Sequence, residues 1–313
     1  MDGLANTFAL SRPLSTDLAR QRTLASAIGC TGIGVHSGRR ARLDIAPAAA
    51  GTGIRFVRAD IGVEIEARFD RVVETRLCTV LGNPENPAAR IGTVEHLMAA
   101  FAACGIDNAM VTVDGPEVPI LDGSAAPFVF LIECAGSVEQ DASRAEIEIL
   151  RPVRVEDGSA FAELRPGLGG FVMAMAIDFG AAAIGRQALT LPLESAAFRR
   201  DLAPARTFTE SNVVEKLRAM GLALGGSLDN AIVVEGERVL NPEGLRMQDE
   251  FVRHKMVDAV GDLALAGAPL RGRFIGHRSG HALNNRLLRA LFADSAAWRI
   301  IGDCPSAPLS AAA

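Results

Sequence analysis

The sequence predicts an α+β fold of two similar domains, each a sheet layered with helices, with the candidate active site sandwiched between them. Both halves run in the same order: short strands, an apolar helix with a histidine in its first turns, a strand, a turn and a final helix. Residues 93–113 and 250–277 are the candidate equivalents, which indicates a duplication, although helical register alone could give the same likeness. Pockets commonly form where two such domains meet.

The expected domain boundaries follow from composition. Domain I is expected at residues 21–136 and domain II at residues 145–300, because apolar periodicity lapses between them, as in a linker. Residues 1–20 are expected to form a flexible N-terminal arm, and residues 301–313 a tail rich in Ala and Pro.

In the first half, short apolar runs between Pro and Gly turns predict strands at residues 42–45, 53–57, 63–67, 76–81 and 108–113. Helical periodicity appears at residues 93–104 and 125–134. Thr93 is the expected N-cap of the first of these helices, and Gly105 is expected to end it.

In the second half, strands are predicted at residues 145–150, 160–164, 171–179 and 271–277, with a Gly-rich turn and strand at 221–234. Helices are predicted at residues 210–220, 249–265 and 282–293. Residues 191–203 are expected to be polar and irregular.

The helix at residues 249–265 carries a narrow line of ionisable side chains on an otherwise apolar surface. Glu250, His254, Asp258 and Asp262 recur every four residues, so they share one helix face. A solvated helix has a broad polar face, and the narrow one here predicts burial on most sides. Burying an imidazole and carboxylates is costly unless they are paired or bound to a metal.

Spacing indicates a metal site. His254 and Asp258 can bind one divalent ion, with Lys255 beside them, although a plain His–Asp hydrogen bond explains so weak a pattern equally well. The helix at residues 93–104 supplies His96 as a third ligand, which leaves a fourth position for water, as in catalytic zinc sites. The adjacent Glu95 could reach that water as a general base.

The chain has three histidines besides His96 and His254. His281 follows a Ser-Gly turn and could protonate a leaving amine or hold an oxyanion. Asp262 is the candidate for orienting His281, with a simple surface charge as the equal alternative. His277 alternates with buried strand positions and receives no role, and His36 lies in a Gly-rich loop that could line a pocket.

Composition limits the classes of protein that remain. A formal net charge of −5 with 22% charged residues argues against a nucleic-acid-binding surface. Five scattered cysteines without a C-x-x-C motif favour reduced thiols in the cytoplasm. No uninterrupted apolar run is long enough to span a membrane, and the N-terminus lacks the pattern of a signal peptide.

With these residues in view, the chain resembles the UDP-3-O-acyl-N-acetylglucosamine deacetylases, zinc amidases of lipid A biosynthesis in Gram-negative bacteria. The likeness covers roughly residues 21–297. The motifs that carry it, in chain order, are QRTL, TGIGVHSG, TVEHLMAA, GIDNAMV, ILDGSAAPFV, ARTF, GGSLDNAIVV, DEFVRHKMVDAVGDL and SGHALNN.

The resemblance implies a role for each matching position. The metal ligands would be His96, His254 and Asp258, holding one Zn²⁺ per chain, and iron could occupy the same ligands. Glu95 would be the base, His281 the proton donor, Asp262 the carboxylate that orients it, and Thr207 the oxyanion contact. Lys255 would contact the diphosphate, with Phe208 and Phe179 near the substrate. The family's fold has two α+β domains around the site, and residues 210–233 would be an insert that forms an apolar passage for the acyl chain.

The predicted activity is therefore zinc-dependent removal of the N-acetyl group from UDP-3-O-acyl-N-acetylglucosamine by a cytoplasmic monomer. A single Glu acting as both base and acid is the mechanistic alternative. Two rival functions share some features. A zinc peptidase would use the same metal chemistry, but the chain has no H-E-x-x-H motif. A nucleotide-sugar-binding protein without catalysis would not need the complete set of ionisable groups.

Overall fold

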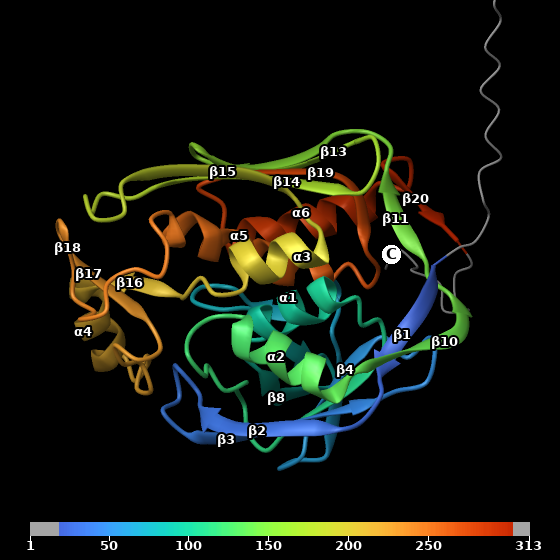
Figure 1. Cartoon of the computed structure of the whole chain (residues 1–313), viewed down its shortest axis with the longest axis horizontal. Helices are drawn as coiled ribbons and strands as arrows, with labels where there is room; N and C mark the ends of the chain where they lie inside the picture. Colours follow the sequence, from blue (N-terminus) through green and yellow to red (C-terminus); the bar gives the residue numbers. More distant parts are fainter. Residues whose placement is uncertain (1–18, 303–313) are drawn as a thin grey trace, which may run out of the picture.

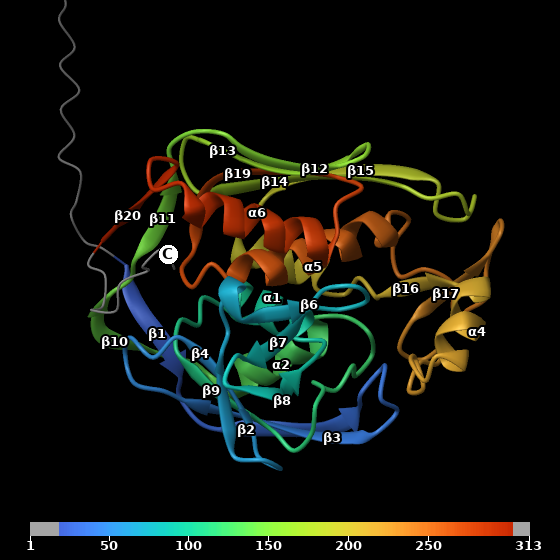
Figure 2. The same cartoon turned by 180° about the vertical axis from the view of Figure 1, so that it is seen from behind.

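The chain folds into a stack of four layers: a sheet, two layers of helices and a second sheet (Figure 1). The structure is a computed structural model and describes residues 19–302. The two helical layers face each other in the middle of the stack, and the view from behind shows the same order (Figure 2). The predicted α+β class, with two units of sheet and helices, is confirmed.

The first half supplies one sheet and the helices that cover it. Its elements are β2 (Ile28–Ile33), β3 (Arg40–Pro47), β4 (Ile54–Arg58), β5 (Val63–Glu66), η1 (Phe69–Arg71), β6 (Val72–Glu74), β7 (Val80–Asn83), β8 (Asn86–Ile91), α1 (Glu95–Cys104), β9 (Ala109–Val113) and α2 (Ala126–Ala135). Five strands pair in the order β2-β3-β9-β4-β5, while β6, β7 and β8 form a smaller sheet. Apolar and exposed positions alternate along β3, which gives the sheet one face for the core.

The second half repeats this plan with a larger sheet. Its elements are β11 (Glu146–Ile149), β12 (Val153–Asp157), β13 (Ala160–Arg165), β14 (Phe171–Asp178), β15 (Arg186–Pro192), α3 (Ser195–Ala197), η2 (Phe198–Leu202), α5 (Glu250–Ala264), β19 (Leu270–His277), α6 (His281–Ala293) and β20 (Trp298–Ile301). The central strand, β19, pairs with β11, β13 and β14. Each half therefore runs from a histidine-bearing helix to a central strand and then to a second helix: α1-β9-α2 and α5-β19-α6.

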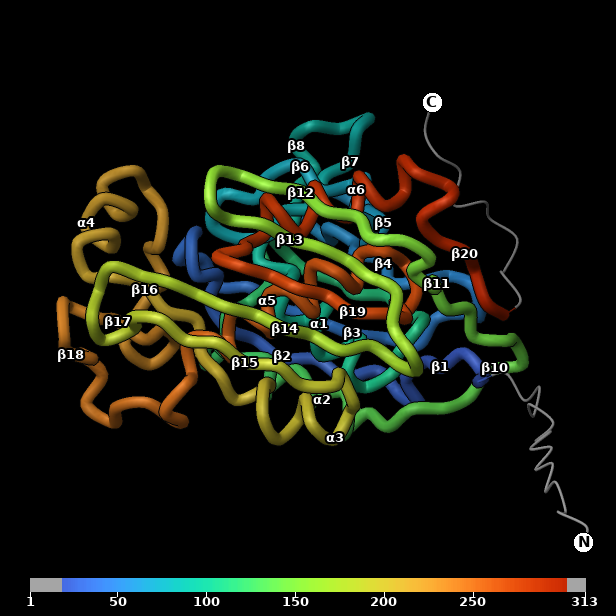
Figure 3. Tube along the Cα trace, turned by 90° about the horizontal axis from the view of Figure 1, so that it is seen from above, coloured from blue at the N-terminus to red at the C-terminus, as the bar shows by residue number. Residues whose placement is uncertain are grey.

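Two smaller units complete the structure: β1 (Arg20–Leu24) with β10 (Ser137–Ser143), and β16 (Phe208–Glu210), α4 (Ser211–Ala219), β17 (Ile232–Glu235) and β18 (Arg238–Val239). β1 and β10 form an antiparallel ribbon at the side of the stack. β16, β17 and β18 form a three-stranded sheet that, together with α4, projects from one end of the molecule (Figure 3).

The expected linker at residues 136–144 is wrong, because β10 occupies most of it. The burial pattern of β10 mixes half-exposed and exposed residues without regular alternation. None of the residues of β10 is buried, so the apolar alternation typical of a strand is missing there. The irregular stretch expected at residues 191–203 instead contains the end of β15, α3 and the π-helical turn η2.

Thr93 is not the N-cap of α1, contrary to expectation. Val94 holds that position and makes no capping hydrogen bond with its side chain. Thr93 has a φ of 59°, a left-handed conformation that is unusual for a β-branched residue. Its hydroxyl donates to Glu117 Oε1 at 3.1 Å instead. Gly105 ends α1 as predicted, with a φ of 68°.

The predicted arm and tail fall largely outside the described residues. Within the described part, Arg20 already belongs to β1, and β20 extends to Ile301, where the tail was expected to start. Across residues 19–302, no helix has both the length and the apolar character needed to cross a bilayer.

Helices α1 and α5 pack directly against each other at the middle of the stack. The contact depends on Gly261 in α5, because a Cβ atom there would lie 1.9 Å from the backbone oxygen of Glu95 in α1. Only glycine allows so close an approach of the two backbones. The approach brings the first turn of α1, with Glu95 and His96, beside the ionisable face of α5.

Candidate metal centre and catalytic site

The ionisable line on α5 is buried, as predicted. Glu250, His254, Asp258 and Asp262 are only 0%, 2%, 4% and 3% exposed. Each of them has a partner in the structure, in agreement with the high cost of burying an unpaired ionisable group.

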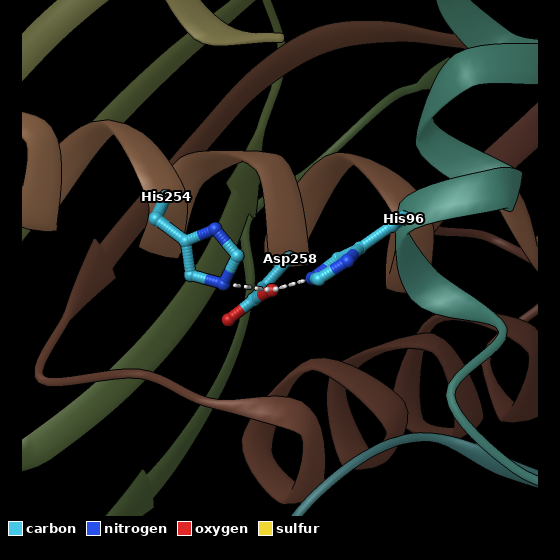
Figure 4. A group of neighbouring side chains, drawn as sticks. All are labelled: His96, His254 and Asp258. Atoms are coloured by element: carbon cyan, nitrogen blue, oxygen red, sulfur yellow. Dashed lines mark ion pairs between the residues drawn. The ribbon is translucent and has the colours of Figure 1, made fainter. Parts of the chain in front are cut away.

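Three side chains from the two halves converge on one point (Figure 4). His96 from α1 meets His254 and Asp258 from α5, with one candidate ligand atom from each residue within 4.8 Å of the others. Asp258 Oδ1 lies 3.2 Å from His254 Nε2 and 3.5 Å from His96 Nε2. The structure therefore brings together the three residues that the sequence predicted as metal ligands.

The hydrogen bonds around these residues leave the right atoms free for a cation. His254 Nδ1 lies 3.1 Å from the Ala205 carbonyl, which can only accept, so in the neutral ring Nδ1 carries the proton and Nε2 has the lone pair. Lys255 Nζ donates to Asp258 Oδ2 at 2.7 Å and leaves Oδ1 on the side of the two imidazoles. Two imidazole nitrogens and a carboxylate oxygen are a donor set that suits zinc or ferrous iron.

The protonation states of the set also suit a cation. Burial lowers the pKa of His96, which favours its neutral, ligating form. Burial alone would raise the pKa of Asp258, but the positive charge beside it, from His254 when that ring is protonated and from the Lys255 ammonium, holds the pKa well below its usual range. The set therefore combines a neutral imidazole with an ionised carboxylate.

Glu95 and His281 form a second pair beside the metal ligands. Glu95 Oε1 lies 3.8 Å from His281 Nε2, and both side chains are buried. Burial raises the pKa of Glu95 to about 7, although the neighbouring His281 opposes the shift. Burial disfavours the charged form of His281, but Asp262 and Glu95 more than offset this and raise its pKa to about 9. A carboxylate thus lies next to an imidazolium near neutral pH.

Asp262 lies behind His281, and its interpretation as a surface charge is wrong. His281 Nδ1 donates to Asp262 Oδ2 at 2.8 Å, so Nε2 is the ring nitrogen that faces Glu95. This is the arrangement that the orienting interpretation predicts.

Sequence reasoning missed two neutral partners of these carboxylates. The Thr79 backbone N–H donates to Glu95 Oε2 at 3.0 Å, and its hydroxyl donates to Asp262 Oδ1 at 2.5 Å. Asn284 Nδ2 donates to Asp262 Oδ2 at 2.8 Å. Asn284 lies in the recognised motif SGHALNN, whereas nothing in the run RLCTVL singles out its threonine.

A cavity of about 550 Å³ opens over this cluster. Nine of the ten predicted site residues line it, and Asp262 is the exception because it lies behind His281. Thr207, Lys255, Phe179 and Phe208 are among the nine. The Phe208 ring packs edge-on against Phe179, with 5.3 Å between centroids.

The unit of β16–β18 and α4 meets the first half at the cavity wall. The backbone N–H groups of Leu224 and Gly225 donate to the carbonyls of His36 and Val35 at 3.2 and 3.1 Å. His36 lines the cavity, as its Gly-rich loop led us to expect. His277 lies outside the cavity lining and stacks on Phe161, with 5.6 Å between centroids.

A buried ion pair fixes Thr207 relative to α5. The adjacent Arg206, whose side chain is buried, lies 2.9 Å from Glu250 through Nε, and its backbone N–H donates to the same carboxylate at 3.0 Å. Glu250 was predicted only as the first member of the ionisable line. The sequence does not indicate the pairing, because Arg206 lies 44 residues before Glu250 in the chain.

Comparison with known proteins agrees with this geometry. A family model described as "UDP-3-O-acyl N-acetylglycosamine deacetylase" matches residues 21–293. The UDP-3-O-acyl-N-acetylglucosamine deacetylase of Acidithiobacillus ferrooxidans is 52% identical over 288 residues, covering 91% of this chain and 93% of that protein. The protein of the same name from Phenylobacterium zucineum is 53% identical over 283 residues, covering 90% and 96%. This chain belongs to the family of UDP-3-O-acyl-N-acetylglucosamine deacetylases.

Proposed function

We propose that the protein removes the N-acetyl group from UDP-3-O-acyl-N-acetylglucosamine and releases acetate and UDP-3-O-acyl-glucosamine, the committed step of lipid A biosynthesis. The carrying observation is that His96, His254 and Asp258 converge next to Glu95 and His281 along one cavity. About half of the sequence is identical to that of deacetylases over some nine-tenths of the chain.

The cation proposed for the site is Zn²⁺, one per chain, held by His96, His254 and Asp258. Three protein ligands with a position left open are typical of catalytic zinc sites, and iron could use the same ligands. When bound, such an ion supplies Lewis acidity toward the amide carbonyl and toward water.

Glu95 is proposed as the general base. Its carboxylate takes a proton from the water whose oxygen attacks the acetyl carbon. His281, protonated and held by Asp262, then gives a proton to the sugar nitrogen as the C–N bond breaks. Without that proton the amine would be too basic to leave. A Glu95 that serves as both base and acid is the alternative that the pH profile below tests.

Thr207 is proposed to hydrogen-bond the oxyanion of the tetrahedral intermediate, a contact on the order of 3 kcal/mol. Lys255 is proposed to contact the diphosphate, because it brings a cationic group to the cavity lining. Phe208 and Phe179 are proposed to pack against the substrate, since their rings line the same wall.

Residues 210–233 are proposed to form the acyl passage. Val213, Val214 and Leu217 of α4 bring apolar side chains to the cavity lining. In a Leu217→Glu variant we expect the KM for a long-chain substrate to rise more than the KM for a short-chain one, because only the long tail would contact the new charge.

We further propose the division into domain I (residues 21–136) and domain II (residues 145–300), and a cytoplasmic enzyme that acts as a monomer. The cysteines of the described residues are all free thiols, which suits a reducing compartment. Nine of the ten residues proposed for the site line one cavity of a single chain, which supports a monomer.

The decisive experiment is a metal analysis combined with a deacetylation assay. The protein as purified, after chelation, and after zinc is restored would be assayed on the acylated UDP-sugar and on peptides. We expect one metal ion per chain, activity on the sugar that is lost and regained with zinc, and none on peptides. Peptide cleavage would support the zinc peptidase, and substrate binding without turnover would support a non-enzymatic binding protein.

A further inference from the structure

Thr79 links the proposed base to the carboxylate behind the proposed acid. It is 2% exposed and lies just before β7, at the contact between the two halves. Its backbone N–H donates to Glu95 Oε2 at 3.0 Å, and its hydroxyl donates to Asp262 Oδ1 at 2.5 Å. One residue of the first half therefore holds a carboxylate from α1 and a carboxylate from α5.

The backbone of Thr79 is itself fixed relative to α1. Its carbonyl accepts a hydrogen bond from the backbone N–H of Val94, the residue that caps the helix, at 3.4 Å. The Thr79 backbone thus contacts both the cap and the first residue of α1. The position of the Thr79 hydroxyl is therefore fixed relative to Glu95.

The Thr79 hydroxyl completes the surroundings of Asp262. Oδ2 accepts from His281 Nδ1 and from Asn284 Nδ2, both at 2.8 Å. Among the described residues, the Thr79 hydroxyl is the side-chain donor to Oδ1. Without it, one oxygen of a buried carboxylate would lack this bond, and the carboxylate could turn away from the imidazole.

We propose that Thr79 is a positioning residue that sets His281 relative to Glu95, acting through Asp262. This role rests on the proposed deacetylase function and adds to it a residue from the first half. Thr79 does not touch the reacting atoms. It fixes the distance between the groups that take up and give up the proton, a task that only a residue bonded to both carboxylates can perform.

The test uses the full-length, metal-loaded enzyme and variants at position 79. Thr79→Val keeps the shape and the backbone bond to Glu95 but loses the hydroxyl. We expect kcat to fall about 10-fold, the scale of one hydrogen bond to a charged group, with KM and metal content unchanged. Thr79→Ser should retain kcat within about 3-fold, because it keeps the donor.

A double variant separates positioning from general stability. In a His281→Ala background, Thr79→Val should lower kcat no further, since the group through which it acts is gone. The matched control is Thr23→Val, which removes another buried threonine hydroxyl, one that bonds the Asn108 carbonyl in the first half. We expect that variant to lower the melting temperature and leave kcat unchanged. If Thr79→Val does not fold, Thr79→Ala replaces it in the same comparison with the His281→Ala background.

Three results would overturn this role: undiminished kcat in Thr79→Val, an equal loss in the His281→Ala background, or a Thr79→Ser variant as slow as Thr79→Val. Each of these requires an active wild-type enzyme, so it contradicts the role of Thr79 alone. A metal-loaded wild-type chain that does not deacetylate the acylated UDP-sugar would overturn the proposed function, and the role of Thr79 with it.

Discussion

Gly261 of α5 faces the backbone carbonyl of Glu95 so closely that a Cβ atom would lie 1.9 Å from its oxygen. This contact sets the distance between the helix that carries Glu95 and His96 and the helix that carries His254 and Asp258. The site is therefore assembled by the packing of two backbones as well as by side chains.

Gly261→Ala should reduce both stability and metal binding. Alanine is favoured over glycine in a helix by about 1 kcal/mol, but a clash with backbone typically costs about 1–3 kcal/mol or more and should dominate. Urea unfolding and metal titration would measure the two effects. Gly180→Ala is the matched control, because a Cβ there meets no atom within 4 Å. Equal stability of the two variants would contradict the close approach.

The pH profile of kcat/KM should be bell-shaped. Glu95 must be ionised to act as a base, so activity should fall as the pH drops through its pKa, which burial raises to about 7. His281 must be protonated, so activity should fall as the pH rises through its pKa of about 9. A bound divalent cation would shift both limbs downward through its positive charge.

The basic limb of that profile identifies the proton donor. Asp262→Asn should move this limb to lower pH, because Asp262 is the main group that raises the pKa of His281. A basic limb that survives unchanged in His281→Ala would remove His281 from the acid role and favour Glu95 as both base and acid.

His254→Ala should lower the affinity for zinc by more than about 100-fold, since even the loss of a residue that only supports a ligand costs up to that much. His96→Ala and Asp258→Ala should behave alike. The control is His277→Ala, whose ring stacks on Phe161 away from the cavity lining. Stoichiometric metal in purified His254→Ala would exclude the proposed ligand set.

Thr207→Val should lower kcat about 100-fold with little change in KM, because an oxyanion contact forms only in the transition state. Thr207→Ser keeps a hydroxyl at the same position and should recover most of the rate. Steady-state kinetics on the acylated UDP-sugar would measure both. If Thr207→Val raised KM and left kcat unchanged, Thr207 would act in substrate binding instead.

Glu250→Gln should destabilise the protein by about 3 kcal/mol, because it leaves the buried Arg206 guanidinium with the more exposed Glu243 as its remaining charged partner. Glu235→Gln removes one partner of an exposed pair with Arg238 and should change the free energy of unfolding by less than about 1 kcal/mol. Chemical denaturation of both variants provides the comparison. Similar values for the two would show that Glu243 alone is enough to stabilise the buried charge of Arg206.

The ionisable line on α5 was predictable because burying charged residues at every fourth position of an apolar helix is costly unless they are paired or bind a metal. Its meeting with His96 was predictable only from the likeness between the halves and from the family resemblance. Thr79 and Asn284 could not be found this way. A neutral hydroxyl or amide becomes important only through the carboxylate that it reaches across the fold.

The errors in the fold have a similar origin. Residues 137–143 form a strand whose partner, β1, lies more than a hundred residues earlier, so no local pattern indicates the pairing. Threonine is a residue type that often caps helices, but the Thr93 hydroxyl donates instead to Glu117, which lies 24 residues further along the chain. Tertiary contacts override local preference at both places.

The hydrogen bond from His254 to the Ala205 carbonyl connects the proposed metal ligands with the segment that carries Thr207. That carbonyl holds one side of the imidazole and the proposed cation would hold the other, and Thr207 lies two residues further along the chain. Demetallation should therefore loosen residues 205–207 and faster amide hydrogen exchange should appear there. Binding of the cation and binding of a transition-state mimic that contacts Thr207 would then be thermodynamically coupled, each being tighter in the presence of the other.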